Sequence, residues 1–449
     1  MRPNPSMLKE NEYDLYCSSC GNSYIDDGYR ITCTICQNKE IKSILEFRPR
    51  YQPEIDYKYS NLARYRNFLP FTGEINDEIV YITTQKSKSF ASKYGFNNLY
   101  FTYTGYNEDL GIASPTCSFK DFEAFGVLNR LKSYDISRPL LLSSAGNTAR
   151  AIAYYAAKIH YPVIIIVPNN SRQYLWLPHE NGLFDNVTKY VKIFFVNQPG
   201  NFNDTAKLAN LLGAHLDDEV LSEGGYFNIG RTCALGICAL SFFDQTGIFP
   251  NHFVQAVGSG SGPLSALRAY RLLKENSLEQ ISFHIIQNYP YVPLVESIKE
   301  ETNVQVGKYL HKIDTACAPM LTSGDPAYNY PGGIYHEMNK GNTFYAYGVT
   351  NEEIYRMQYE FWKLEKKQLL LPAAATVAGL IKVKKDGRIK DEEVIQVNIT
   401  GCGDIAKRNN DGYFYIPSFN DVSISKEVCN SELVFEKWFK SSEGYFVDW

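Results

Sequence analysis

The sequence lacks a strong excess of charge of either sign. Its 449 residues carry 45 Lys and Arg against 49 Asp and Glu, which gives a formal net charge of −4 at pH 7. Proteins that bind nucleic acid or an anionic membrane surface need a basic face, and this composition gives no indication of one. We therefore expect neither a nucleic-acid partner nor a membrane partner.

Long apolar runs are also missing. The two longest cover residues 161–167 and 369–381, and both are shorter than the roughly 20 residues that span a bilayer. The first residues, Met1-Arg2-Pro3-Asn4-Pro5, lack the apolar core of a signal peptide. The sequence thus predicts a soluble cytoplasmic protein, and its length and 44% hydrophobic content allow two or three domains.

Two nucleotide-binding patterns are absent from the most glycine-rich turn, Gly258-Ser259-Gly260-Ser261-Gly262. It lacks the G-x-G-x-x-G spacing of dinucleotide sites, and no Gly-Lys-Ser or Gly-Lys-Thr closes it as in a P-loop. The turn nevertheless lies between an apolar strand pattern and a helical pattern. Backbone N–H groups and serine hydroxyls at such a place can hold a phosphate group, although an ordinary strand-to-helix turn has the same appearance.

Four of the ten cysteines form two CxxC pairs separated by twelve residues: Cys17, Cys20, Cys33 and Cys36. This spacing predicts a zinc-ribbon-like knuckle with four thiolate ligands. Because four sulfurs complete the tetrahedron, the zinc would be structural. A knuckle that has lost its metal and two redox pairs are the alternatives, and redox pairs would need a neighbouring βαβ pattern that residues 1–48 do not show.

Strand and helix patterns alternate from about residue 120 onward, after a Tyr- and Arg-rich stretch at 49–110 in which we expect irregular structure with a few strands. The alternation predicts doubly wound α/β domains with parallel sheets. The expected strands cover residues 139–142, 163–167, 191–196, 253–257, 282–287 and 394–400, and the expected helices cover 122–131, 147–159, 204–212, 263–274 and 373–382.

A second small-residue turn and one lysine complete the candidate site. The turn Ser143-Ser144-Ala145-Gly146-Asn147-Thr148 follows an apolar strand, so the helix N-terminus after it can bind a substrate carboxylate. An ordinary capped helix start is the alternative. Lys120 lies in Ser118-Phe119-Lys120-Asp121 directly before an apolar helical pattern, where loss of solvent can lower the pKa of its amine and make it reactive.

These segments together resemble the threonine synthase branch of the fold type II pyridoxal phosphate enzymes, whose fold is tryptophan synthase β-like. Within that branch the chain is most similar to the cysteate synthases, and the resemblance covers about residues 12–408. It depends on Cys117-Ser118-Phe119-Lys120 followed by Glu123-Ala124, on residues 144–151, on Gly332-Gly333-Ile334-Tyr335, on Pro372-Ala373-Ala374-Ala375, and on Asn398-Ile399-Thr400-Gly401.

The resemblance implies a role for each motif. Lys120 would carry pyridoxal phosphate and move protons at Cα, Asn147 would contact the cofactor's ring oxygen, residues 258–262 would hold its phosphate, and Thr400 would face its pyridine nitrogen. Residues 49–137 with 251–449 would form the larger, cofactor-binding domain, and residues 138–250 the smaller one, after the cysteine segment at 1–48. A homodimer is expected.

The implied activity is a transferase or lyase reaction of amino-acid biosynthesis: β-replacement on O-phospho-L-serine with sulfite, giving L-cysteate and phosphate. Arg150 and Arg172 are candidates for binding the oxyanions, although surface roles are the alternative for both. Cys402, where glycine is expected, and Asp121, where glutamate is expected, depart from the family pattern. Threonine synthase, β-replacement with another small nucleophile, and a catalytically silent binding or scaffold protein remain open.

Overall fold

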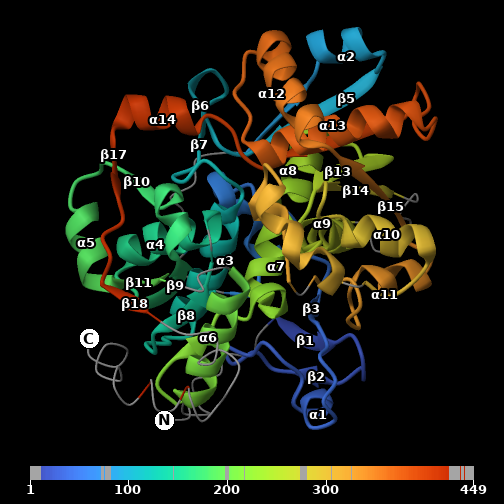
Figure 1. Cartoon of the computed structure of the whole chain (residues 1–449). Coiled ribbons are helices and arrows are strands. Elements are labelled where there is room, and N and C mark those ends of the chain that lie inside the picture. The colour runs from blue at the N-terminus through green and yellow to red at the C-terminus, as the bar shows by residue number, and fades with distance from the viewer. Residues whose placement is uncertain are drawn as a thin grey trace.

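Two parallel sheets organise the chain, and Figure 1 shows them in two neighbouring lobes. The computed structural model describes residues 12–71, 75, 82–144, 146–197, 202–216, 218–273, 281–304, 306–324, 326–423, 435 and 439. No helix in this part of the chain is long and apolar enough to cross a bilayer. All strands and helices predicted from residue 120 onward are present, which confirms the α/β alternation.

The larger sheet has six strands in the order β15-β14-β13-β16-β5-β4. They are β15 (Thr343–Val349), β14 (Ser282–Asn288), β13 (His252–Ala256), β16 (Val394–Ile399), β5 (Asn98–Tyr103) and β4 (Thr83–Lys86). Neighbouring strands are parallel, apart from β4, which pairs antiparallel with β5. Parallel neighbours require crossover connections, which here include α9 (Ser261–Leu273), α10 (Pro293–Glu300), α12 (Asn351–Glu365) and α13 (Leu371–Lys385).

The smaller sheet has five parallel strands in the order β12-β8-β9-β11-β18. They are β12 (Leu221–Ser222), β8 (Leu140–Ser143), β9 (Val163–Pro168), β11 (Val191–Asn197) and β18 (Asn420–Ser423). All six residues of β9 are buried, as expected for a central strand covered on both faces. The division into domains at 138–250 remains a prediction, and β18 adds a strand from residues 420–423 to the sheet of that range.

Helix α3 (Lys120–Ser133) occupies a central position in Figure 1. Eleven of its 14 residues are buried, because it packs against α4 (Asn147–Ile159) on one side and α7 (Ile229–Leu235) on another. Helices α5 (Leu183–Tyr190) and α6 (Phe202–His215) also pack against strands of the smaller sheet, whereas α8 (Ile237–Thr246) packs against α9. Helix α3 therefore connects the packing of both lobes.

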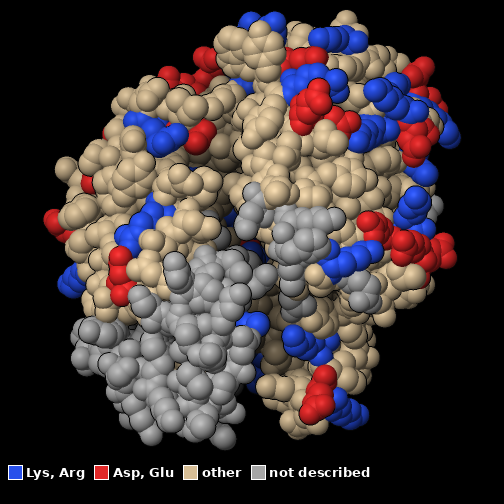
Figure 2. Space-filling view, viewed as in Figure 1, with Lys and Arg blue, Asp and Glu red and all other residues tan. Residues whose placement is uncertain are grey.

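The surface carries charges of both signs. Figure 2 shows Lys and Arg side chains interspersed with Asp and Glu on one face, which agrees with the nearly balanced composition. Arg388 and Asp386 form one of the exposed ion pairs, with side chains 40% and 49% exposed. Pairs of this kind add little to stability, about 0–1 kcal/mol each, so the packed interior determines the fold.

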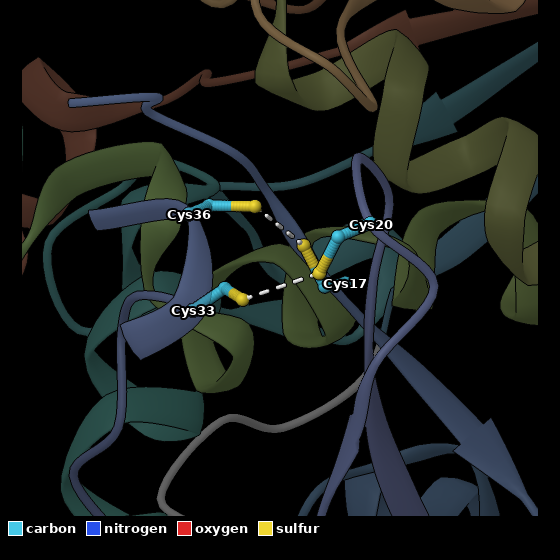
Figure 3. A group of neighbouring side chains, drawn as sticks. All are labelled: Cys17, Cys20, Cys33 and Cys36. Carbon is cyan, nitrogen blue, oxygen red and sulfur yellow. Dashed lines mark hydrogen bonds between the residues drawn. The ribbon is translucent and has the colours of Figure 1, made fainter. Parts of the chain in front are cut away.

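The N-terminal unit is a three-stranded antiparallel sheet with a four-cysteine cluster. Its strands β1 (Tyr13–Cys17), β2 (Ser23–Tyr24) and β3 (Leu45–Pro49) pair in the order β2-β1-β3, and the short helix α1 (Thr34–Gln37) lies beside them. Figure 3 shows the cysteines converging: Cys17 ends β1, Cys20 follows in the turn, Cys33 directly precedes α1, and Cys36 lies within it.

The sulfur geometry of this cluster suits a metal ion. All four Sγ atoms lie within 4.8 Å of one another, with Cys17–Cys36 at 3.7 Å and Cys20–Cys33 at 3.6 Å. A tetrahedral zinc with Zn–S bonds of about 2.3 Å places its sulfurs about 3.8 Å apart, whereas a disulfide requires about 2.0 Å. The donor set therefore fits zinc, as the CxxC spacing predicts, and no sulfur pair is at disulfide distance.

A buried ion pair fastens this unit to α3. Arg130 donates to both carboxylate oxygens of Asp26, over 2.9 Å from Nε and 2.6 Å from Nη2, and neither side chain is more than 2% exposed. The Tyr13 hydroxyl donates to the same carboxylate over 3.0 Å and lies 2.9 Å from the Tyr134 hydroxyl. The N-terminal unit and the far end of α3 therefore behave as one packed body.

We predict that Cys36→Ser removes zinc from the purified protein, because three thiolates and a hydroxyl bind this ion far less tightly than four thiolates. The measurement is zinc content by atomic absorption together with the thermal midpoint, which should fall. Cys317→Ser, at a half-buried cysteine outside the cluster, is the control and should retain both. Equal zinc in the two variants would contradict the metal assignment.

Asp26→Asn is expected to lower the free energy of unfolding by about 3–5 kcal/mol, because it leaves the Arg130 guanidinium buried without its counter-charge. Denaturant titration measures the change. The neighbouring Asp27→Asn is the control. It removes one partner of an ion pair with Arg30 whose two side chains are partly exposed, at 20% for Asp27 and 25% for Arg30. That variant should lose no more than about 1 kcal/mol.

Candidate active site

The segment that precedes Lys120 is tied to the carboxyl end of β16. The backbone N–H of Phe119 donates to the carbonyl oxygen of Thr400 over 3.0 Å, and Ser118 forms an antiparallel bridge with Gly401. Lys120 then begins α3. Two residues predicted to contact the same cofactor, Lys120 and Thr400, are thus brought together although they lie far apart in the sequence.

The Lys120 side chain is mostly buried and 23% exposed. Its ε-amine donates to Oε1 of Glu123, one helical turn further along α3, and lies 4.7 Å from the centre of the Phe119 ring. Burial lowers the pKa of Lys120, and Arg231 lowers it further, while the Glu123 carboxylate opposes both effects. A lowered amine pKa favours the nucleophilic, uncharged form.

Glu123 belongs to a buried charge cluster formed by Lys120, Glu123, Arg231 and Glu223. Arg231 lies 2.9 Å from Glu123 Oε2 and 3.1 Å from Glu223, and the Thr148 hydroxyl donates to Glu123 Oε2 over 3.0 Å. Burial disfavours the ionised form of Glu123, but Arg231 and Lys120 together hold the pKa of this carboxyl below its usual value. The cluster has two charges of each sign.

A contact between two glycines brings Arg231 to this place. A Cβ on Gly126 of α3 would lie 2.1 Å from the carbonyl oxygen of Gly230 in α7, so the helices cross with their backbones in contact. The Asn228 side chain caps α7 by accepting the N–H of Gly230 over 3.0 Å. No sequence pattern marks Arg231 or Glu223, since their partner lies on another helix.

Asp121 faces away from the charge cluster. Its carboxylate accepts the backbone N–H of Thr116 over 3.0 Å and the Thr116 hydroxyl over 2.7 Å. Burial raises the pKa of Asp121 to about 6, despite these hydrogen bonds. The residue that departs from the family pattern therefore closes the loop before the lysine, while Glu123 on the same turn reaches the amine.

Residues 143–148 form the turn between β8 and α4, with Ala145 outside the described residues. The Ser144 hydroxyl accepts the N–H groups of Gly146 and Ala149, over 3.4 and 3.1 Å. Ser143 donates to the Thr205 hydroxyl over 2.9 Å. Thr148, in contrast, donates to Glu123, so the first turn of α4 adjoins the Lys120 cluster.

The glycine turn at 258–262 lies at the same sheet edge as Thr400, because β13 and β16 are parallel neighbours and both end there. Gly260 has φ +86°, and a Cβ on it would lie 2.6 Å from Ile334 Cδ1. A Cβ on Gly262 would lie 2.1 Å from Gln255 Nε2. Side chains at these positions would collide with Ile334 and Gln255, so the close packing of the turn that leads into α9 requires glycine at both.

The residues present fit pyridoxal phosphate. The turn at 258–262 offers helix N-terminal N–H groups and the hydroxyls of Ser259 and Ser261, which lie 3.2 Å apart. Beside the Lys120 segment, the buried Ser118 hydroxyl has no hydrogen-bond partner among the described residues. The lysine segment, the serine- and glycine-rich turn and Thr400 thus lie at one edge of the larger sheet.

The two arginines proposed from the sequence as oxyanion ligands differ in position. Arg150 is buried, where it donates to the Thr116 carbonyl and to Asn147 Oδ1, the latter over 3.3 Å, and its guanidinium lies 4.4 Å from the Trp176 ring centre. Arg172 is 40% exposed and pairs with Asp421 of β18. Arg150 therefore joins the two site loops, and Arg172 is a surface residue in this structure.

Cys402, the other departure from the family pattern, is buried behind the site. Its thiol lies 3.6 Å from the Thr104 carbonyl oxygen, and burial raises its pKa to about 12. Its backbone packs against Gly105, where a Cβ would lie 2.4 Å from the Cys402 carbonyl oxygen. The thiol is therefore uncharged at neutral pH and packed against the backbone of the segment after β5.

The sequence of this chain matches a known protein family. Residues 106–401 match the model of the pyridoxal-phosphate dependent enzyme family. A cysteate synthase of Methanosarcina barkeri is 30% identical over 405 residues, which cover 87% of this chain and 92% of that protein. A cysteate synthase of Methanosarcina mazei is 30% identical over 434 residues, which cover 94% of this chain and 99% of that protein.

Solved structures share the fold at low sequence identity. A threonine deaminase isoform 2 from Solanum lycopersicum has a TM-score of 0.55 at 16% identity and covers 74% of this chain and 87% of its own. A pyridoxal 5'-phosphate-dependent aspartate racemase has a TM-score of 0.54 at 17% identity, covering 72% and 91%. With the family match, these similarities confirm the predicted fold type II, tryptophan synthase β-like architecture.

The family match covers the lysine, both candidate loops and Thr400, and the similarity to the relatives extends over most of both chains. The chain therefore belongs to the pyridoxal-phosphate dependent enzymes and, within them, to the family that includes the cysteate synthases.

Proposed function

We propose that this enzyme replaces the phosphate of O-phospho-L-serine with sulfite to give L-cysteate. In the balanced reaction the Cβ–O bond breaks, phosphate leaves with the bonding electrons, and the sulfur lone pair of hydrogen sulfite forms the Cβ–S bond. The proton of hydrogen sulfite passes to the released phosphate, and no external oxidant or reductant is needed. The named relatives are cysteate synthases, which supports this substrate pair.

One observation carries the proposal: Lys120 begins α3 at the point where its segment is fastened to Thr400 and where Glu123 connects it to Thr148. A single lysine amine thus adjoins both the predicted cofactor contact and the predicted substrate turn. This is the arrangement that a lysine needs if it is to hold a cofactor and then move a proton at the substrate's Cα.

We assign a role to each motif of the site. When bound, pyridoxal phosphate acts as the electron sink that acidifies the Cα–H bond and allows loss of the β-substituent. Lys120 removes and returns the Cα proton, and the N-terminus of α4 with residues 143–148 binds the substrate carboxylate. Residues 258–262 bind the cofactor's phosphate, Asn147 its ring oxygen and Thr400 its pyridine nitrogen. The uncharged Thr400 hydroxyl does not force protonation of that nitrogen, which favours elimination at Cβ.

We further propose that the enzyme acts in the cytoplasm as a homodimer with no nucleic-acid partner, and that the zinc of the four-cysteine cluster is structural. The ion would have four sulfur ligands and no open position for substrate. Residues 49–137 with 251–449 would form the larger domain and 138–250 the smaller. Sedimentation of the purified protein measures the oligomeric state directly.

The substrate pair can be tested by following the visible absorbance of the bound cofactor together with phosphate release. We expect O-phospho-L-serine to change the absorbance and release phosphate, and sulfite to restore the original spectrum as cysteate forms. If sulfide or another small nucleophile restores the spectrum and sulfite does not, the enzyme makes a different product. A response only to O-phosphohomoserine would indicate threonine synthase, and a protein with no bound cofactor would indicate a binding role.

Lys120→Ala should reduce the rate of cysteate formation by roughly 10²–10⁴-fold, because no other amine of the cluster can take the Cα proton. The matched control is Lys132→Ala, at an exposed lysine near the end of the same helix, and it should leave the rate unchanged. Mass spectrometry after borohydride reduction gives a second readout, since only chains with Lys120 should retain the cofactor covalently. A wild-type rate in Lys120→Ala would exclude Lys120 as the catalytic amine.

A further inference from the structure

The ε-amine of Lys120 has a carboxylate partner on its own helix. Glu123 lies three residues later, so the two side chains share one face of the first turn of α3, and Nζ donates to Oε1. The Glu123 side chain is only 1% exposed. The N-terminal end of a helix carries partial positive charge, which favours a carboxylate there and disfavours an ammonium ion. The negative charge of Glu123 therefore offsets the repulsion between the helix dipole and a protonated Lys120.

The second oxygen of Glu123 is fixed by two further groups from other helices. Thr148 of α4 donates to Oε2 over 3.0 Å, and Arg231 of α7 lies 2.9 Å from the same oxygen. Arg231 is in turn held by Glu223 at 3.1 Å. Because three helices fix the carboxylate, its free oxygen Oε1 can point at only one place, the lysine amine.

We propose that Glu123 is a positioning residue for Lys120: it is the counter-charge of the protonated side-chain nitrogen, both while the cofactor is attached to it and after the amine is released, and so fixes where the proton taken from Cα is held. This inference rests on the proposed function for its chemical purpose. An ammonium ion held by a rigid carboxylate returns its proton from a defined position, whereas a mobile lysine would sample many rotamers and exchange that proton with solvent.

The neighbouring carboxylate cannot take this role. Asp121 is on the same helical turn, but its two oxygens accept from the N–H and the hydroxyl of Thr116. The charged and titratable groups that act on Lys120 are Glu123 on α3, Arg231 on α7, and Glu223 before α7. Glu123 is the one among them that contacts the amine, while Glu223 acts through Arg231.

The test is a pH titration of the visible absorbance of the cofactor bound to the full-length holoenzyme. Glu123→Gln keeps the size of the side chain and removes its charge. Without the carboxylate, the protonated nitrogen of Lys120 loses its nearest counter-charge, so the titration midpoint should move down by about one pH unit. This readout does not require turnover, and it therefore remains informative if sulfite proves not to be the second substrate.

Glu223→Gln is the matched control, because it removes a second carboxylate of the same cluster that binds Arg231 at nearly the same distance but does not contact Lys120. Its midpoint should move less than that of Glu123→Gln. An unchanged midpoint in Glu123→Gln, or an equal shift in both variants, would overturn the proposal. Loss of thermal stability without a midpoint shift would likewise show that Glu123 has only a structural role.

A second variant keeps the inference testable if Glu123→Gln does not fold. Glu123→Asp retains the charge but is one methylene shorter, so its carboxylate can remain near Arg231 without reaching Lys120 Nζ. We expect a smaller downward midpoint shift than for Glu123→Gln and faster exchange of the Cα proton of cysteate with deuterium, measured by NMR, because a less restrained ammonium ion exchanges its proton with solvent. A midpoint and an exchange rate equal to those of the wild type would overturn the proposed contact.

Discussion

The hydrogen bond from the Phe119 N–H to the Thr400 carbonyl is the contact on which the arrangement of the site depends. It fastens the start of α3 to the end of β16, next to the strand that leads into the glycine turn at 258–262. The start of α3, the end of β16 and the neighbouring glycine turn are therefore connected at one junction. A lysine on a mobile loop could not be presented to a cofactor with comparable accuracy, because productive geometry tolerates deviations of only about 0.5 Å.

Burying four charges at this junction is possible because they balance. Burial lowers the pKa of Lys120 and the Glu123 carboxylate opposes this, whereas Arg231 and Lys120 keep the pKa of Glu123 below its usual value, so each cation has a carboxylate beside it. The glycine contact between α3 and α7 is part of this electrostatic arrangement, since larger residues at Gly126 or Gly230 would separate the helices. The ion pair between Arg231 and Glu123 therefore depends on the close packing of these two helices.

The sequence predicted what local patterns determine and missed what tertiary contacts determine. Strands such as β9 and the turns at 143–148 and 258–262 were identified because their apolar runs and small residues are contiguous. Strand β15, with the mixed sequence TFYAYGV, and helix α12 were not. Arg231 joins the site only through a helix crossing, and Arg150 and Arg172 were proposed as oxyanion ligands because sequence position cannot distinguish a buried loop contact from a surface pair.

Helix α3 carries a buried ionic contact near each end. Lys120 and Glu123 lie at its start, and Arg130, about 15 Å further along the axis, binds Asp26 of the N-terminal unit. A helix of this kind is stiff, and 11 of its 14 residues are buried, so a displacement at one end cannot be absorbed by local unfolding without exposing the core. The four-cysteine unit is therefore packed against the same element that presents the lysine, which gives a physical reason for a metal-binding cluster far from the lysine itself.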